Sequence, residues 1–113
     1  MALKLSGHLF TGPFPIDTTE VRGNQAPVVY AIIAKGGEPW APSFRVIDMG
    51  FSEDTGVRFA DLPNRAAWIA EGGGQVAVYL FYAPKSEYSL EDRRAMAEQL
   101  RRAHDPPNGF AEA

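Results

Sequence analysis

The stretch "PVVYAIIAKGGEPWAPSFRVIDMG", residues 27–50, decides the fold because it holds two apolar runs separated by a short break. Pro27 to Ala34 is an almost continuous series of β-branched and aromatic residues, which predicts a buried strand. Residues 35–43 contain two glycines and two prolines, so we expect a loop there. Residues 44–50 predict a second strand. A connection this short favours an antiparallel hairpin, since a parallel crossover needs about a dozen residues or more.

Three more elements follow the hairpin. Residues 61–71 predict a short helix that ends at a run of glycines. Residues 75–83, "QVAVYLFYA", predict a third strand, the most apolar of the set. Residues 89–104 predict the clearest helix, because Ser89 and Asp92 have the spacing of a capping box, with aspartate in place of the usual glutamate.

These elements predict an α+β fold. We expect a small three-stranded, mainly antiparallel sheet flanked by helices, in the order β-β-α-α-β-α, where the first, short α stands for the mixed segment after residue 50. Residues 1–26 are rich in turn-forming residues and are expected to be an irregular N-terminal arm with little regular structure. Residues 27–113 are expected to form a single domain, and a chain of 113 residues is long enough to bury a core.

Composition excludes several classes of site. The chain has no cysteine, so neither a disulfide framework nor a thiolate metal site can form. No apolar run reaches the length of about 18 residues that a membrane span needs, and the N-terminus lacks the pattern of a signal peptide. We therefore expect a cytoplasmic protein that does not bind membranes. The net charge of −3 means that any nucleic-acid surface would have to be a local basic patch.

Three features each carry a structural and a functional interpretation. The glycines at 72–74 close a predicted helix and precede a strand, the reverse of the order in a phosphate-binding loop. The last helix carries several arginines, which form either a solvated face or a phosphate contact through Arg94 and Arg101, seven positions apart. Tyr30 lies inside an apolar strand, where a buried tyrosine with a satisfied hydroxyl is the usual case and a catalytic one the alternative.

Four short segments, taken in order, resemble a known family. They are Val28-Val29-Tyr30 in the first strand, Asp48-Met49-Gly50 in the second, Arg58 eight residues after Gly50, and "LRRAHDPPNG" at the end of the last helix. Together they resemble the GIY-YIG nuclease superfamily, over roughly residues 27–109. That superfamily has a three-stranded antiparallel sheet with flanking helices, and its first two strands carry Gly-Ile-Tyr and Tyr-Ile-Gly.

The resemblance implies roles for particular residues. In the superfamily the first tyrosine helps to activate water, the arginine stabilises charge on the phosphate, and a helical glutamate holds one magnesium or manganese ion. Carried over to this chain, Tyr30 and Arg58 would be catalytic and Glu98 would be the metal ligand. Gly50 and Asn108 would have structural roles.

The chain departs from the family pattern at four positions, one of which is Asn108, since it comes one residue earlier than the closing asparagine of the family. Val28 stands where the first glycine would be, and Asp48 stands where the second tyrosine would be. Asp48 is a third catalytic candidate, because a carboxylate can act as a ligand or as a base. Alignment of the closing segment without a gap puts Ala97, not Glu98, at the glutamate position, and one residue turns a helical side chain by about 100°.

Three functions therefore stay open. The first is metal-dependent cleavage of phosphodiester bonds in DNA or RNA, which would make the protein a hydrolase that uses Mg²⁺ or Mn²⁺. The second is a non-catalytic binding or regulatory module on the same scaffold, and the third is a shared small scaffold with an unrelated role. Whether the chain is a monomer or a homodimer also stays open, with Trp40, Phe51 and Phe110 as aromatic residues expected to be partly exposed.

Overall fold

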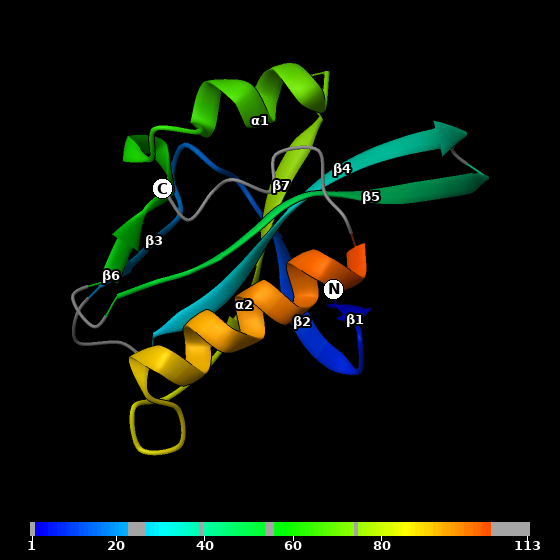
Figure 1. Ribbon diagram of the computed structural model, residues 1–113. Coiled ribbons are helices and arrows are strands. Elements are labelled where there is room, and N and C mark those ends of the chain that lie inside the picture. Colours follow the sequence, from blue (N-terminus) through cyan, green and yellow to red (C-terminus); the bar gives the residue numbers. More distant parts are fainter. Residues whose placement is uncertain (1, 23–26, 39, 54–55, 74, 105–113) are drawn as a thin grey trace.

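Strands dominate the computed structural model, which describes residues 2–22, 27–38, 40–53, 56–73 and 75–104. A five-stranded antiparallel sheet has the order β1-β2-β7-β4-β5, and two further short strands, β3 and β6, pair with each other (Figure 1). The strands are β1 Ala2–Leu5, β2 His8–Phe14, β3 Glu20–Arg22, β4 Val28–Glu38, β5 Ala41–Phe51, β6 Gly56–Arg58 and β7 Val76–Tyr82. The helices are a 3₁₀ turn, η1 Phe59–Asp61, and two α-helices, α1 Arg65–Glu71 and α2 Leu90–His104.

The predicted three-stranded sheet in the order β-β-α-α-β-α is wrong, because the first 26 residues supply two more strands of the main sheet. β1 pairs with β2, and β2 pairs with β7. The predicted irregular N-terminal arm is therefore wrong as well, since most of it lies in the sheet or in β3. Ser6 and Gly7 connect β1 to β2 with φ values of 48° and 87°, the positive values that a two-residue hairpin turn requires.

Several predicted elements are confirmed. β4 and β5 form the antiparallel hairpin that the stretch at 27–50 indicates. β7 forms the predicted apolar strand, and it lies beside β4 in the centre of the sheet. The N-terminus of α2 has the expected capping box: the Ser89 N–H donates to the Asp92 carboxylate at 2.9 Å, and the Asp92 N–H donates to the Ser89 hydroxyl at 3.1 Å.

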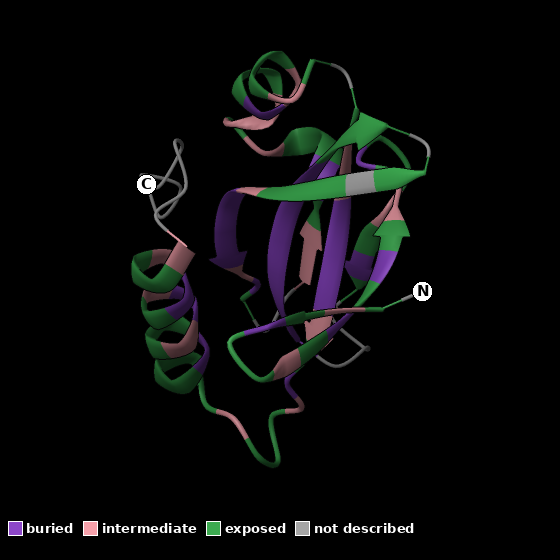
Figure 2. Ribbon diagram, turned by 90° about the vertical axis from the view of Figure 1, so that its right-hand side faces the viewer, coloured by how far each residue is buried: buried purple, intermediate pink, exposed green. Residues whose placement is uncertain are grey.

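The central strands of the sheet are buried on both faces. Successive side chains of a strand point to opposite faces, so each central strand contributes to two clusters. Tyr30 and Ile32 of β4 point to the first face, where they pack with residues of α1, η1 and β3. Val29 and Ile33 point to the second face, where α2 supplies Ala97 and Leu100. Figure 2 shows the buried strands with α2 packed beside them. We call these the first and second faces below.

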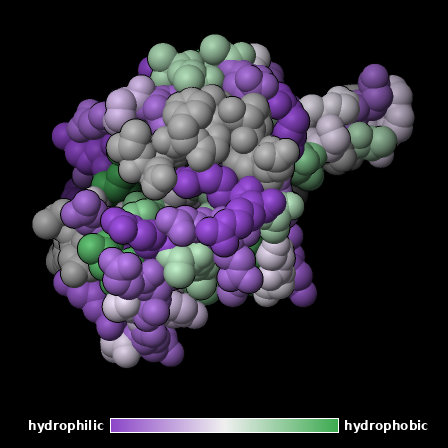
Figure 3. Space-filling view, in the orientation of Figure 1, coloured by the Kyte–Doolittle hydropathy of each residue, from purple (hydrophilic) through white to green (hydrophobic). Residues whose placement is uncertain are grey.

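β4 and β5 continue as a paired hairpin beyond Val76, the first residue of β7. This finding corrects the predicted loop at residues 35–43. β7 stops pairing with β4 at Ala34, whereas β4 and β5 stay in register as far as Glu38 and Ala41. We call residues 35–45 the projecting hairpin; it stands clear of the body of the molecule (Figures 1 and 3). Its tip carries Trp40, which is 80% exposed.

Within the described residues, no helix combines the length and the apolar character needed to cross a membrane.

Candidate functional site

Tyr30 and Gly50 are direct partners on neighbouring strands, and the glycine makes room for the tyrosine. A β-carbon at Gly50 would overlap the Tyr30 hydroxyl and ring. Tyr30 is buried on the first face, with its ring edge-on to Phe59 at 4.9 Å and to Trp68 at 6.2 Å between centroids. Tyr30 and Gly50, two of the residues that the resemblance singles out, therefore meet in the core of the protein.

Asp48 is fully buried on the same face. The register of β4 against β5 shifts at this point, since Ile32 pairs with Asp48 while Ile33 pairs with Val46. The extra residue of this β-bulge directs Asp48 toward α1. One carboxylate oxygen accepts the Met49 N–H at 2.8 Å, and the other accepts the Nε1–H of Trp68 at 2.7 Å.

Burial controls the acid–base behaviour of both groups. Burial raises the pKa of Asp48 to about 6, although its two hydrogen bonds and the charge of Arg101 act in the opposite direction. Burial also raises the pKa of Tyr30 well above its ordinary value, and the nearby Asp48 charge adds to this effect. A tyrosine with a raised pKa keeps its proton at neutral pH, so the Tyr30 hydroxyl is a poor general base.

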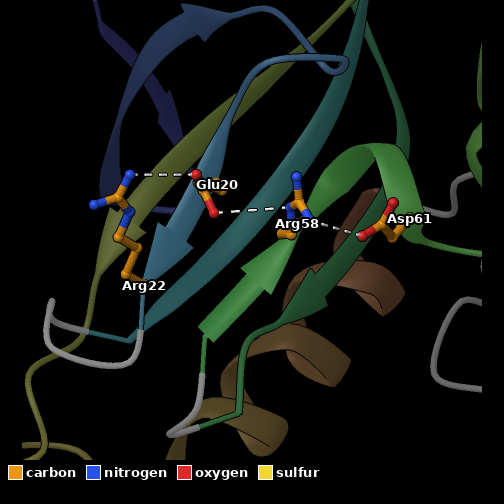
Figure 4. Close-up of polar contacts among 4 residues, drawn as sticks. All are labelled: Glu20, Arg22, Arg58 and Asp61. Atoms are coloured by element: carbon orange, nitrogen blue, oxygen red, sulfur yellow. Dashed lines mark ion pairs between the residues drawn. The ribbon is translucent and has the colours of Figure 1, made fainter.

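Arg58 lies elsewhere, on the outer surface of the β3–β6 pair. Its guanidinium stands 3.8 Å from the Glu20 carboxylate and 3.7 Å from the Asp61 carboxylate (Figure 4). Glu20 also contacts Arg22, at 3.6 Å. The Arg58 side chain is 71% exposed, and ion pairs this exposed contribute little to stability. The charge that would face a phosphate therefore has two carboxylates beside it.

Glu98 lies on α2, which covers the second face. It is half-buried and forms an ion pair with Arg102 at 3.9 Å, while its neighbour Ala97 is buried against the sheet. The one-residue offset noted in the sequence therefore points the carboxylate away from the sheet. The structure brings Tyr30 and Asp48 together in the core, but it separates them from both Arg58 and Glu98.

Two arginines of α2 have structural contacts that the sequence interpretation missed. Arg93 is fully buried, and its guanidinium donates to the Ser52 carbonyl at 3.1 Å and to the Tyr88 carbonyl at 3.3 Å. Arg101 is half-buried and donates to the Met49 carbonyl at 2.6 Å. Arg93 stands four residues before Ala97 and seven before Leu100, so helical spacing already placed it on the buried stripe.

Arg94 differs from these two arginines. It is exposed, and its guanidinium lies over the Phe51 ring at 5.9 Å from the centroid. The predicted phosphate contact by Arg94 and Arg101 therefore has only one exposed member, because Arg101 is bonded to β5.

No group of three or more histidine, aspartate or glutamate side chains in the described residues is arranged to hold a metal ion. The Mg²⁺ or Mn²⁺ ion expected from the resemblance stays a prediction. Asn108, the second residue with an expected structural role, lies outside the described residues.

Comparison with protein-family models, with curated proteins and with solved structures finds no match to this chain in any of the three. The resemblance to the GIY-YIG superfamily therefore stays a prediction.

Proposed function

We propose that this chain is a non-catalytic binding module. The observation that carries the proposal is the position of Asp48, the residue that stands where the resemblance expects a tyrosine. Its carboxylate is fully buried and both of its oxygens accept hydrogen bonds from the protein. A group used in this way stabilises the core and is not open to a substrate.

The geometry of the remaining candidates supports the same proposal. Phosphodiester cleavage needs an activated nucleophile, a cation at the phosphate and a metal ligand within one accessible concavity. Here Tyr30 is in the core, whereas Arg58 contacts acidic side chains at the surface and Glu98 contacts Arg102 on α2. This arrangement favours a scaffold whose polar groups maintain the fold.

The surface that best fits a binding role is the projecting hairpin. Trp40 at its tip is 80% exposed and Phe44 near its base is 39% exposed. Exposed aromatic residues are enriched in protein–protein interfaces. The hairpin carries one acidic and two basic side chains, and Arg45 is paired with Glu71 at 3.0 Å. Phosphate binding needs several free cations, so this surface favours a protein partner over nucleic acid.

The first experiment tests for cleavage. The protein is incubated with supercoiled plasmid, single-stranded DNA and RNA, each with Mg²⁺ or Mn²⁺. We expect no product above a buffer blank. Metal-dependent cleavage that is lost in Arg58→Ala and kept in Arg22→Ala would overturn the proposal. Arg22 is a matched control because its side chain has the same exposure of 71% and also contacts Glu20.

A second experiment tests the class of partner. Fluorescence anisotropy of labelled single-stranded DNA, duplex DNA and RNA is followed as the protein is added at low salt, where phosphate contacts are strongest. We expect no saturable change. Saturable binding that weakens in Lys35→Ala would assign the hairpin to nucleic acid instead of protein.

A further inference from the structure

Two adjoining hollows lie where the projecting hairpin leaves the sheet. One has a volume of about 280 Å³ and the other of about 420 Å³. Ile33 and Phe44 border both hollows. The first extends to Val76 and Tyr79 and the second to Leu5 and Val46, so most of the lining is apolar. We call these two hollows together the root groove.

The tip of the same hairpin carries the side chain that such a groove would accommodate. Trp40 is the most exposed of the large apolar side chains among the described residues, at 80%. A tryptophan held at the end of a projecting element, away from the body, is typical of an anchor that fills a pocket on a partner.

The charges on the hairpin are also complementary between base and tip. Lys35 borders the root groove, and Glu38 lies near the tip. Both also border a third hollow of about 450 Å³. Neither forms an ion pair within the described part of the chain. The hairpin therefore offers a free cation at its base and a free anion near its tip.

The base of the hairpin is bonded to α1. Arg45 donates to the Glu71 carboxylate and to the Glu71 main-chain carbonyl, each at 3.0 Å. The carbonyl belongs to the last residue of α1, where a cation is favoured by the helix dipole. This contact joins the base of the hairpin to α1.

We propose that the partner is a second copy of this chain. Two projecting hairpins lie side by side and antiparallel across a two-fold axis, so that Trp40 of each copy occupies the root groove of the other. Two-fold symmetry makes the contact reciprocal: where the tip of one copy meets the base of the second, the tip of the second meets the base of the first. Each Glu38 then faces a Lys35 of the other copy. This inference rests on the proposed binding function and names its partner.

Side-chain packing holds these hairpins together in this arrangement. Pro42 of β5 has no N–H to donate, so it interrupts a strand ladder along that edge. The contacts that remain are the Trp40 anchor and the paired charges. An interface of this small size belongs to the weak, concentration-dependent class.

The first test measures association by sedimentation equilibrium over protein concentrations up to about 1 mM, the range of weak complexes. We expect the wild type to approach the mass of a dimer and Trp40→Ala to raise the dissociation constant at least tenfold. Tyr82→Ala is the matched control, because Tyr82 is 49% exposed at the opposite end of β7. A wild type that is monomeric throughout, or a dimer that Trp40→Ala leaves unchanged, would overturn the inference.

The second test uses charge reversal. Lys35→Glu and Glu38→Lys each place like charges together in a homodimer, so each should associate at least tenfold more weakly than the wild type. An equimolar mixture of the two variants restores both opposite-charge pairs, and we expect it to dimerise like the wild type. A mixture that associates no better than either variant alone contradicts the inference. A monomer without nuclease activity overturns only the dimer, whereas metal-dependent cleavage overturns the proposed function itself.

Discussion

The carboxylate of Asp48 accepts a hydrogen bond of 2.7 Å from the indole of Trp68 in the interior of the protein. Asp48 belongs to β5 and Trp68 to α1, so this bond attaches the helix to the sheet. The other carboxylate oxygen accepts the Met49 N–H at the β-bulge. One buried acid therefore holds both the helix and the local shape of the strand.

Asp48→Asn should destabilise the protein. An amide has one acceptor oxygen and one NH₂ donor, so it cannot accept from both Met49 and Trp68. One of these N–H groups would face another donor inside the core. This should lower the free energy of unfolding by about 1–3 kcal/mol. Urea unfolding measures the loss. Asp61→Asn, at a side chain that is 67% exposed, is the control and should change little; equal stability of both variants would contradict the prediction.

Stability should also depend on the ionisation of Asp48. Burial raises the pKa of Asp48 in the folded protein from 3.8 to about 6, so between these two pH values the folded state holds a proton that the unfolded state has released. The resulting stabilisation is complete below about pH 4 and is lost as the pH rises through about 6. A shift of two pKa units corresponds to about 3 kcal/mol at most.

The measurement is the free energy of unfolding of the wild type and of Asp48→Asn between about pH 4 and pH 7. The other acidic groups titrate alike in both proteins, so the difference isolates Asp48. We expect the stability of the wild type relative to Asp48→Asn to fall as the pH rises. A difference that is constant, or that grows with pH, would show that Asp48 is charged throughout.

Gly50→Ala should destabilise the protein more than Gly36→Ala. A β-carbon at Gly50 overlaps the ring and hydroxyl of the buried Tyr30, and relief of such overpacking costs about 1–3 kcal/mol. At Gly36 the nearest atom is the Ser43 hydroxyl oxygen at 3.4 Å, an ordinary contact. Thermal unfolding compares the two variants. Similar melting temperatures would mean that Tyr30 can move aside at little cost.

The sequence predicts the central part of the fold because its signals there are local. The apolar runs of β4, β5 and β7 and the capping box of α2 each decide their own element. The N-terminal strands were missed because their glycines and prolines resemble those of a loop. Their signal was the Ser6-Gly7 pair, a hairpin turn flanked by apolar residues, but only pairing with β7 makes β2 a strand of the sheet.

The candidate site was predictable only in part. The antiparallel hairpin that pairs Tyr30 with Gly50 was predicted, although the pairing itself was not, and the offset of Glu98 follows from helical periodicity. The burial of Asp48 was not predictable, because it depends on a one-residue bulge in β5 and on a tryptophan 20 positions away. The surface position of Arg58 depends on pairing between β3 and β6, which the irregular-arm prediction excluded.

Arg101→Met and Arg102→Met should differ although the residues are adjacent on α2. Arg101 donates to the Met49 carbonyl at 2.6 Å and its charge lowers the pKa of Asp48, whereas the Arg102 side chain is 81% exposed and meets only Glu98, at 3.9 Å, among the described residues. A charged hydrogen bond contributes about 1.5–3 kcal/mol and an exposed ion pair less than about 1 kcal/mol.

Urea unfolding should therefore show a clear loss of stability for Arg101→Met and almost none for Arg102→Met. Removal of the Arg101 charge should also raise the pKa of Asp48 further, which moves the pH-dependent loss of stability to higher pH in Arg101→Met alone. This second readout separates the electrostatic role of Arg101 from simple packing, since a methionine keeps most of the aliphatic contact. An unchanged pH profile in Arg101→Met would show that its guanidinium does not act on Asp48.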